Sequence, residues 1–182
     1  MATEKLYWAD PFARTFEAPP PRFATWEGRP SLVLERTLFY PEAGGQLADK
    51  GTLQLGSSEP PLAIEDVQVG DDGVIHHLGA DVEALAARVA GAGAEALGAT
   101  RGAIDVPRRR DFMAQHTAQH ALSRALLDEA RAATVSSRLG ANVCTIDVDR
   151  SEIDERELAR AEDLVNAIAL DDVPVRALFP TD

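Results

Sequence analysis

The sequence contains little cysteine and few basic residues. Only one of its 182 residues is cysteine, Cys144, which excludes an intrachain disulfide and a zinc site built from several thiolates. Lys and Arg together number 18 against 30 Asp and Glu, so the formal net charge is −12. This balance excludes a protein that coats nucleic acid through charge alone. A metal site would therefore depend on histidine, and any contact with RNA would be local.

Long apolar runs are also missing. The first eight residues contain no apolar signal segment, and no stretch approaches the roughly 20 apolar residues that span a bilayer. We therefore expect a cytoplasmic protein that does not enter a membrane. Apolar residues nevertheless make up 45% of the chain, which is enough for one or two small domains with a hydrophobic core.

The first part of the chain has the pattern of a β domain. Short apolar segments separated by turn residues predict a small barrel or curled sheet. A helix is expected at 81–90, followed by a loop at 98–105 that leads back to a strand ending at Pro107. We place a domain boundary there, between 106 and 107. The strands expected before it cover 32–34, 37–40, 52–55, 62–69 and 73–78.

The remaining residues, 107–182, predict an α+β domain. The expected elements are a long helix at 109–130, strands at 132–137 and 143–148, a second helix at 151–170 and a last strand at 173–179. Ser151 is the expected N-cap of the second helix.

Two histidines lie four residues apart on the long predicted helix. Residues at this spacing share one helical face, so His116 and His120 can bind one cation. A zinc-protease motif is excluded, because Thr117 stands where that motif requires a glutamate base. The spacing alone is equally compatible with an incidental structural pair.

A glycine-rich segment follows the strand predicted at 37–40. Pro41, Gly44 and Gly45 predict a tight excursion in which the backbone can approach a ligand closely. Gln46 would there present an amide that both donates and accepts hydrogen bonds. The alternative is an ordinary β-turn with a glutamine on the surface.

Arg108, Arg109 and Arg110 form the main local basic cluster. These side chains could hold phosphates. They could equally be a solvated helix start, where cations oppose the helix dipole.

Together the segments from Thr37 to Gly51 and from His116 to His120 resemble the editing domain of alanyl-tRNA synthetases and their free-standing AlaX relatives. The residues at 3–12 and 139–147 resemble the free-standing members. The resemblance implies an α+β fold in which a translation-protein-like β-barrel, here 1–106, precedes the α+β domain shared by threonyl- and alanyl-tRNA synthetases, here 107–182. It implies hydrolysis, in trans, of serine or glycine wrongly attached to the tRNA for alanine.

The resemblance also implies roles for individual residues. Gln46 and Thr37 match catalytic residues that orient the substrate, and Thr37 matches the threonine that senses a serine hydroxyl. His116 and His120 match zinc ligands. The tRNA acceptor end is the implied partner, with the Arg108–Arg110 cluster as a candidate contact.

The family's zinc site is completed by a downstream Cys-x-x-x-His pair that these 182 residues lack. We therefore expect two further zinc ligands beyond this sequence and interpret the α+β domain as truncated. Cys144 is a possible third ligand, although its alternation with Ile146 and Val148 favours packing in the core. His76 and His77 are weaker candidates, because neighbouring residues on a strand point to opposite faces.

Two alternatives remain from the sequence. The chain could be an editing fold without a competent metal site that binds tRNA or a partner without catalysis. It could also be an unrelated β-barrel protein whose motifs match by chance. The sequence does not determine which amino acid is removed, or the oligomeric state.

Overall fold

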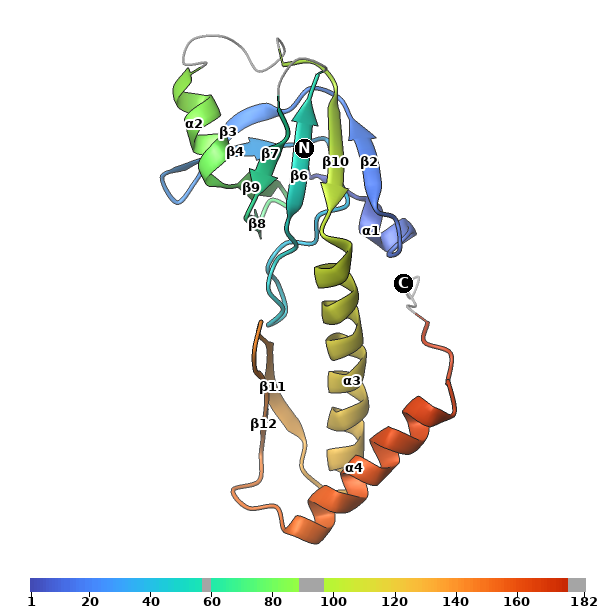
Figure 1. The fold of residues 1–182 in the computed structure, drawn as a ribbon. Helices are drawn as coiled ribbons and strands as arrows, with labels where there is room; N and C mark the ends of the chain where they lie inside the picture. Colours follow the sequence, from blue (N-terminus) through green and yellow to red (C-terminus); the bar gives the residue numbers. More distant parts are fainter. Residues whose placement is uncertain (57–59, 89–96, 177–182) are drawn as a thin grey trace. The chain divides into compact units, whose positions relative to one another are not determined.

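The computed structural model describes residues 1–56, 60–88 and 97–176 (Figure 1). The chain divides into two compact units, Met1–Arg110 and Asp111–Asp182. The boundary falls within the long helix α3, Val106–Ala130, whereas the sequence placed it between 106 and 107. In the described part of the chain, no helix has both the length and the apolar character needed to cross a bilayer.

The first unit consists mainly of β-strands, with two short helices. The strands predicted at 32–34, 52–55 and 73–78 overlap observed strands, but only Thr37 of the strand predicted at 37–40 lies in a strand. The strand expected at 62–69 is broken at Glu65 into β7 (Leu62–Ile64) and β8 (Asp66–Val69), which belong to different sheets. The sequence missed β1, β2 and β3. The loop expected at 98–105 contains strand β10. The elements are β1 (Glu4–Lys5), α1 (Leu6–Ala9), β2 (Thr15–Ala18), β3 (Arg22–Trp26), β4 (Arg29–Val33), β5 (Arg36–Thr37), β6 (Gly51–Leu55), β7 (Leu62–Ile64), β8 (Asp66–Val69), β9 (Ile75–Leu78), α2 (Ala80–Arg88) and β10 (Thr100–Ile104).

The strands of the first unit form two four-stranded sheets, in the orders β2-β10-β6-β7 and β3-β4-β9-β8. Figure 1 shows β10 lying between β2 and β6, where it pairs antiparallel with both. The short strands β1 and β5 pair in parallel. These pairings confirm mixed sheet and helix content, while closure into a barrel stays a prediction.

The core of the first unit follows from alternation along its strands. Leu53 and Leu55 on β6 are buried, as are Leu62 and Ile64 on β7, whereas the residues between them are more exposed. Helix α2 adds Val82 and Leu85 to the buried set. Side chains at every second strand position thus face one apolar interior.

The second unit combines the main part of α3 with β11 (Thr134–Leu139), β12 (Cys144–Val148) and α4 (Glu155–Leu170). β11 and β12 overlap the strands predicted at 132–137 and 143–148, and the structure shows that they form an antiparallel pair. The strand expected at 173–179 is absent over 173–176, and 177–179 lie outside the described residues. The small buried core consists of Ala125, Leu126, Ala130, Ala132 and Ala161.

Helix α4 begins at a capping box, and Asp154 rather than Ser151 is its N-cap. The Asp154 carboxylate accepts hydrogen bonds from the backbone N–H groups of Arg156 and Glu157, both at 2.8 Å. The Glu157 side chain in turn accepts from the Asp154 N–H at 3.1 Å. Asp154 followed three residues later by glutamate completes this reciprocal pattern, which Ser151 followed by Asp154 does not.

Replacing Asp154 with alanine is expected to destabilise the second unit by about 1 kcal/mol, because two helix N–H groups lose their acceptor. Urea unfolding followed by far-UV circular dichroism measures the change. Asp163→Ala, an exposed acidic position within α4, is the matched control and should leave the stability unchanged or slightly higher. Equal losses in the two variants would contradict the capping role.

Candidate functional site

The glycine-rich segment forms a two-residue hairpin between Ala43 and Gln46. The Gln46 N–H donates to the Ala43 carbonyl at 3.0 Å, and the Ala43 N–H donates to the Gln46 carbonyl at 3.2 Å. Gly44 and Gly45 have φ values of +60° and +80°, as in a type I′ turn. Residues other than Gly, Asn and Asp rarely adopt these positive φ values. The β-turn that the sequence offered as the alternative to a binding loop is therefore present. The Gln46 residue, however, is only 6% exposed and is not a surface glutamine.

The base of this loop is closed by Tyr40 and Asp49. The Tyr40 N–H donates to the Asp49 carboxylate at 2.7 Å, and the Asp49 N–H donates to the Tyr40 carbonyl at 3.0 Å. A third backbone bond runs from the Glu42 N–H to the Val67 carbonyl on β8 at 2.8 Å. The loop is therefore held at its base and along one side.

The buried Arg109 side chain also contacts the base of the loop, through Asp49. Its Nε lies 3.2 and 3.1 Å from the two Asp49 carboxylate oxygens, and its terminal nitrogens donate to the carbonyls of Leu38 and Pro11. The side chains of Arg109 and Asp49 are 7% and 1% exposed. A buried guanidinium with these partners cannot also hold a phosphate, so the predicted tRNA contact is wrong for Arg109.

The two neighbouring arginines differ from Arg109. Arg108 is half-buried and donates from Nε to the Ala48 carbonyl at 2.9 Å, while Arg110 is exposed. Contact of Arg108 and Arg110 with tRNA stays a prediction.

Thr37 lies at the end of β5, where the loop begins, and is fully buried. Its Oγ1 is 2.9 Å from Nε2 of His77 and accepts a hydrogen bond from the Phe39 N–H at 3.1 Å. His77 is also fully buried, and burial lowers the pKa of its imidazole to about 4. His76 lies on the opposite face of β9 and is bonded to Ser31, so the adjacent histidines separate as the strand geometry predicted.

His116 and His120 do lie side by side on α3. Their rings are stacked, with centroids 4.9 Å apart and 22° between the planes. Burial, and then the proximity of His120, lowers the pKa of His116, which favours the neutral imidazole that binds metals.

The pair alone does not make a complete metal site. Catalytic zinc sites use three protein ligands and structural sites four. In residues 1–56, 60–88 and 97–176, no group of three or more His, Cys, Asp or Glu side chains is placed to hold a metal ion. The two histidines thus fit part of a zinc site and leave the rest of the ligand set unassigned.

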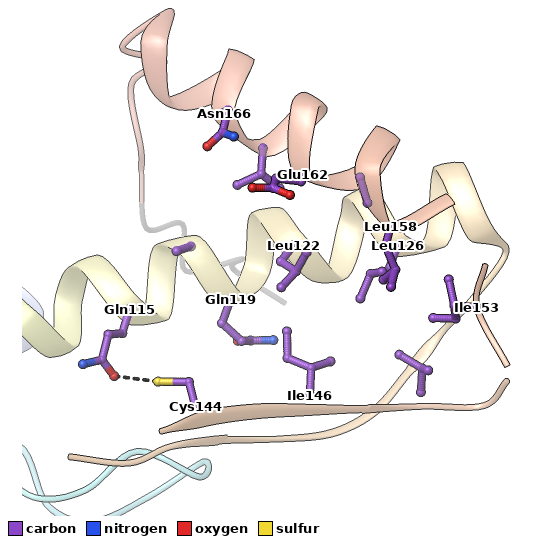
Figure 2. A pocket seen from close by; sticks show the side chains of 14 residues that line it. Gln115, Gln119, Leu122, Leu126, Cys144, Ile146, Ile153, Leu158, Glu162 and Asn166 are labelled. Atoms are coloured by element: carbon purple, nitrogen blue, oxygen red, sulfur yellow. Dashed lines mark hydrogen bonds between the residues drawn. The ribbon is translucent and has the colours of Figure 1, made fainter. Parts of the chain in front are cut away.

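Cys144 is exposed, which corrects its predicted place in the core. Figure 2 shows it at an apolar groove of the second unit, where its thiol donates to the Gln115 side-chain oxygen at 2.9 Å. It does share a face of β12 with Ile146 and Val148, as predicted, and all three line the groove of about 680 Å³ between α3, β12 and α4. The side chain is exposed because this groove is open.

The sequence did not indicate that Asp49 and Arg109 close the base of the loop, or that His77 is hydrogen-bonded to Thr37. Asp49 and Arg109 are 60 residues apart and Thr37 and His77 are 40 apart. No local spacing rule links residues at such separations. The only local signal was the position of Asp49 just after the glycine-rich segment.

Comparison with known proteins identifies the family. The family model for class II (A) tRNA synthetases matches residues 24–89. The alanyl-tRNA editing protein AlaX-M of Methanosarcina acetivorans is 34% identical over 174 residues, which cover 95% of this chain and 67% of the relative. AlaX-M of Methanosarcina mazei is 30% identical over 91% of this chain and 63% of its own length.

The alanine–tRNA ligase of Halorubrum lacusprofundi is also similar, with 34% identity over 98% of this chain. This match covers only 18% of the ligase. The matches to the AlaX-M proteins cover about two thirds of those proteins. The similarity to AlaX-M extends along nearly the whole sequence. The chain therefore belongs to the AlaX family of alanyl-tRNA editing proteins.

Proposed function

We propose that this protein hydrolyses the ester bond between a wrong amino acid, serine or glycine, and the tRNA for alanine. The observation that carries the proposal is the 34% identity to an alanyl-tRNA editing protein along 95% of the chain. Because the chain belongs to the same family as the AlaX-M editing proteins, we propose that it acts in trans on tRNA charged elsewhere. The acceptor end of that tRNA is the proposed partner, and the cytoplasm the proposed location.

The proposed chemistry is attack of water on the carbonyl carbon of the aminoacyl ester. The C–O bond to the terminal ribose breaks, and the ribose hydroxyl leaves with a proton. Gln46 is proposed to orient the substrate, since its amide can donate to an oxygen and accept from an amine or a water molecule. The hydrogen bonds that hold the hairpin between Ala43 and Gln46 support this role, because a fixed backbone keeps the Gln46 amide in one position.

Zinc is the proposed cofactor, with His116 and His120 as two of its ligands. When bound, zinc would act as a Lewis acid or lower the pKa of a bound water molecule. Since the histidines fit only part of a ligand set, no step of the proposed hydrolysis is assigned to the metal.

We propose binding of tRNA without catalysis as a second candidate function, because among the described residues only the His116 and His120 pair fits part of a zinc site. The two candidates differ in what the histidines contribute. Catalysis requires the pair for turnover, whereas a binding module would retain its affinity for tRNA when the pair is removed.

Deacylation of seryl-, glycyl- and alanyl-tRNA for alanine by the purified chain tests both candidates, with added zinc and with a chelator. We expect zinc-dependent loss of the seryl or glycyl ester and little loss of the alanyl ester. The double variant His116→Ala, His120→Ala and the single variant Gln46→Ala should each lower the rate at least about 100-fold, as for misplaced catalytic groups.

Gln54→Ala is the matched control for Gln46→Ala, because Gln54 lies on β6 outside the loop, and it should retain the activity. No ester loss by the folded chain in zinc, together with unchanged tRNA affinity in the double histidine variant, would establish the binding module instead.

A further inference from the structure

We propose that His77 is a positioning residue of the editing site, acting through Thr37 on the loop that carries Gln46. The inference rests on the proposed function for its activity readout. It assigns a role to a buried histidine outside the glycine-rich segment and the histidine pair.

The hydrogen-bond partners of His77 fix its tautomer. Nδ1 lies 3.0 Å from the Leu32 carbonyl oxygen, which can only accept, so Nδ1 carries the hydrogen. In a neutral imidazole the other nitrogen is then an acceptor. Nε2 must therefore receive the hydroxyl hydrogen of Thr37, 2.9 Å away.

This bond orients the Thr37 hydroxyl. With its hydrogen directed to His77, the oxygen presents its lone pairs elsewhere and accepts from the Phe39 N–H at 3.1 Å. The Phe39 ring also lies edge-on to the imidazole, with 5.4 Å between ring centroids. The polar chain from Leu32 through His77 and Thr37 thus fixes the backbone where the loop begins.

The hydrogen bonds from Leu32 through His77 to Thr37 lie entirely in the interior of the first unit. The Thr37 side chain is fully buried, and its hydroxyl is held by His77 and by the Phe39 N–H, so the backbone leading into the loop is held with it. The loop is pinned at its other end by the bonds between Tyr40 and Asp49. Gln46 therefore depends on both ends for its position.

Activity of four variants tests the role. His77→Leu and Thr37→Val should each lower kcat roughly 10- to 100-fold, as expected when a reacting group is displaced by about 1 Å. Their double variant should be no worse than either single variant, because both remove one chain of bonds. His77→Gln, which can still accept from Thr37, and Thr37→Ser, which keeps the hydroxyl, should stay within about threefold of the parent.

His76→Leu is the matched control, because His76 is a neighbouring histidine on the same strand that is bonded to Ser31 rather than to Thr37. It should retain the parent kcat. The proposal is overturned if His77→Leu stays folded with the parent kcat, if His76→Leu loses as much, or if the effects of His77→Leu and Thr37→Val multiply.

Hydrogen exchange of the Phe39 amide provides a readout that does not depend on activity. Exchange should be slow in the parent and in His77→Gln, and faster in Thr37→Val and His77→Leu, relative to amides of β6. If the parent hydrolyses no ester, the proposed function fails and this measurement decides the positioning role. Unchanged Phe39 protection in His77→Leu would then overturn it.

Discussion

Replacing Arg109 with methionine is expected to lower the free energy of unfolding of the first unit by about 3–5 kcal/mol, the usual cost of removing one partner of a buried ion pair. The Asp49 side chain is 1% exposed, so its carboxylate would remain buried without its counter-ion. The carbonyls of Leu38 and Pro11 would also lose their donor. Urea unfolding of the folded variant at constant pH measures the loss.

Arg101→Met is the matched control, because its ion pair with Glu17 is exposed, with side chains 76% and 74% accessible. It should cost less than about 1 kcal/mol. The double variant Arg109→Met, Asp49→Leu should recover part of the stability lost in Arg109→Met, since no charge is left buried. A loss in Arg109→Met as small as that in Arg101→Met would contradict the structural role.

The sequence predicted the parts of this protein that depend on local pattern. Short alternating segments indicated most strands of the first unit, and the histidine spacing placed His116 and His120 on one helical face. The Gly44-Gly45 pair indicated the turn. In each case the residues that determine the feature are close together in the chain.

Features that depend on distant residues could not be predicted in this way. Arg109 was grouped with Arg108 and Arg110 because the three are adjacent, yet its environment is set by Asp49, which lies 60 residues earlier. The hydrogen bond of His77 likewise joins it to Thr37, which lies on another strand. A charge cluster in a sequence therefore does not show which of its members faces solvent.

The error at Cys144 has a different cause. Its alternation with Ile146 and Val148 was correct, but alternation shows only that residues share a face. Whether that face is covered depends on what packs against it, and here the groove between α3, β12 and α4 is open.

Acid is expected to destabilise the first unit through His77. The imidazole has a pKa of about 4 in the folded protein, mainly because it is fully buried, against 6.5 as its ordinary value. Between these values the unfolded chain binds a proton that the folded chain does not, so stability falls as pH decreases. The contribution is complete above about pH 7 and decreases by about 2 kcal/mol on going down to about pH 5.

Urea unfolding at several pH values in the parent and in His77→Gln measures this contribution. The glutamine does not titrate, so the variant should show a smaller loss of stability between about pH 7 and pH 5. Burial lowers the pKa of His76 in the same direction, and His76→Gln therefore serves as the comparison. Because His77 is fully buried and His76 is not, the change in pH dependence should be larger in His77→Gln. Equal pH dependence in the parent and in His77→Gln would mean that the pKa of His77 is the same in the folded and unfolded states, and would contradict the lowering of this pKa by burial.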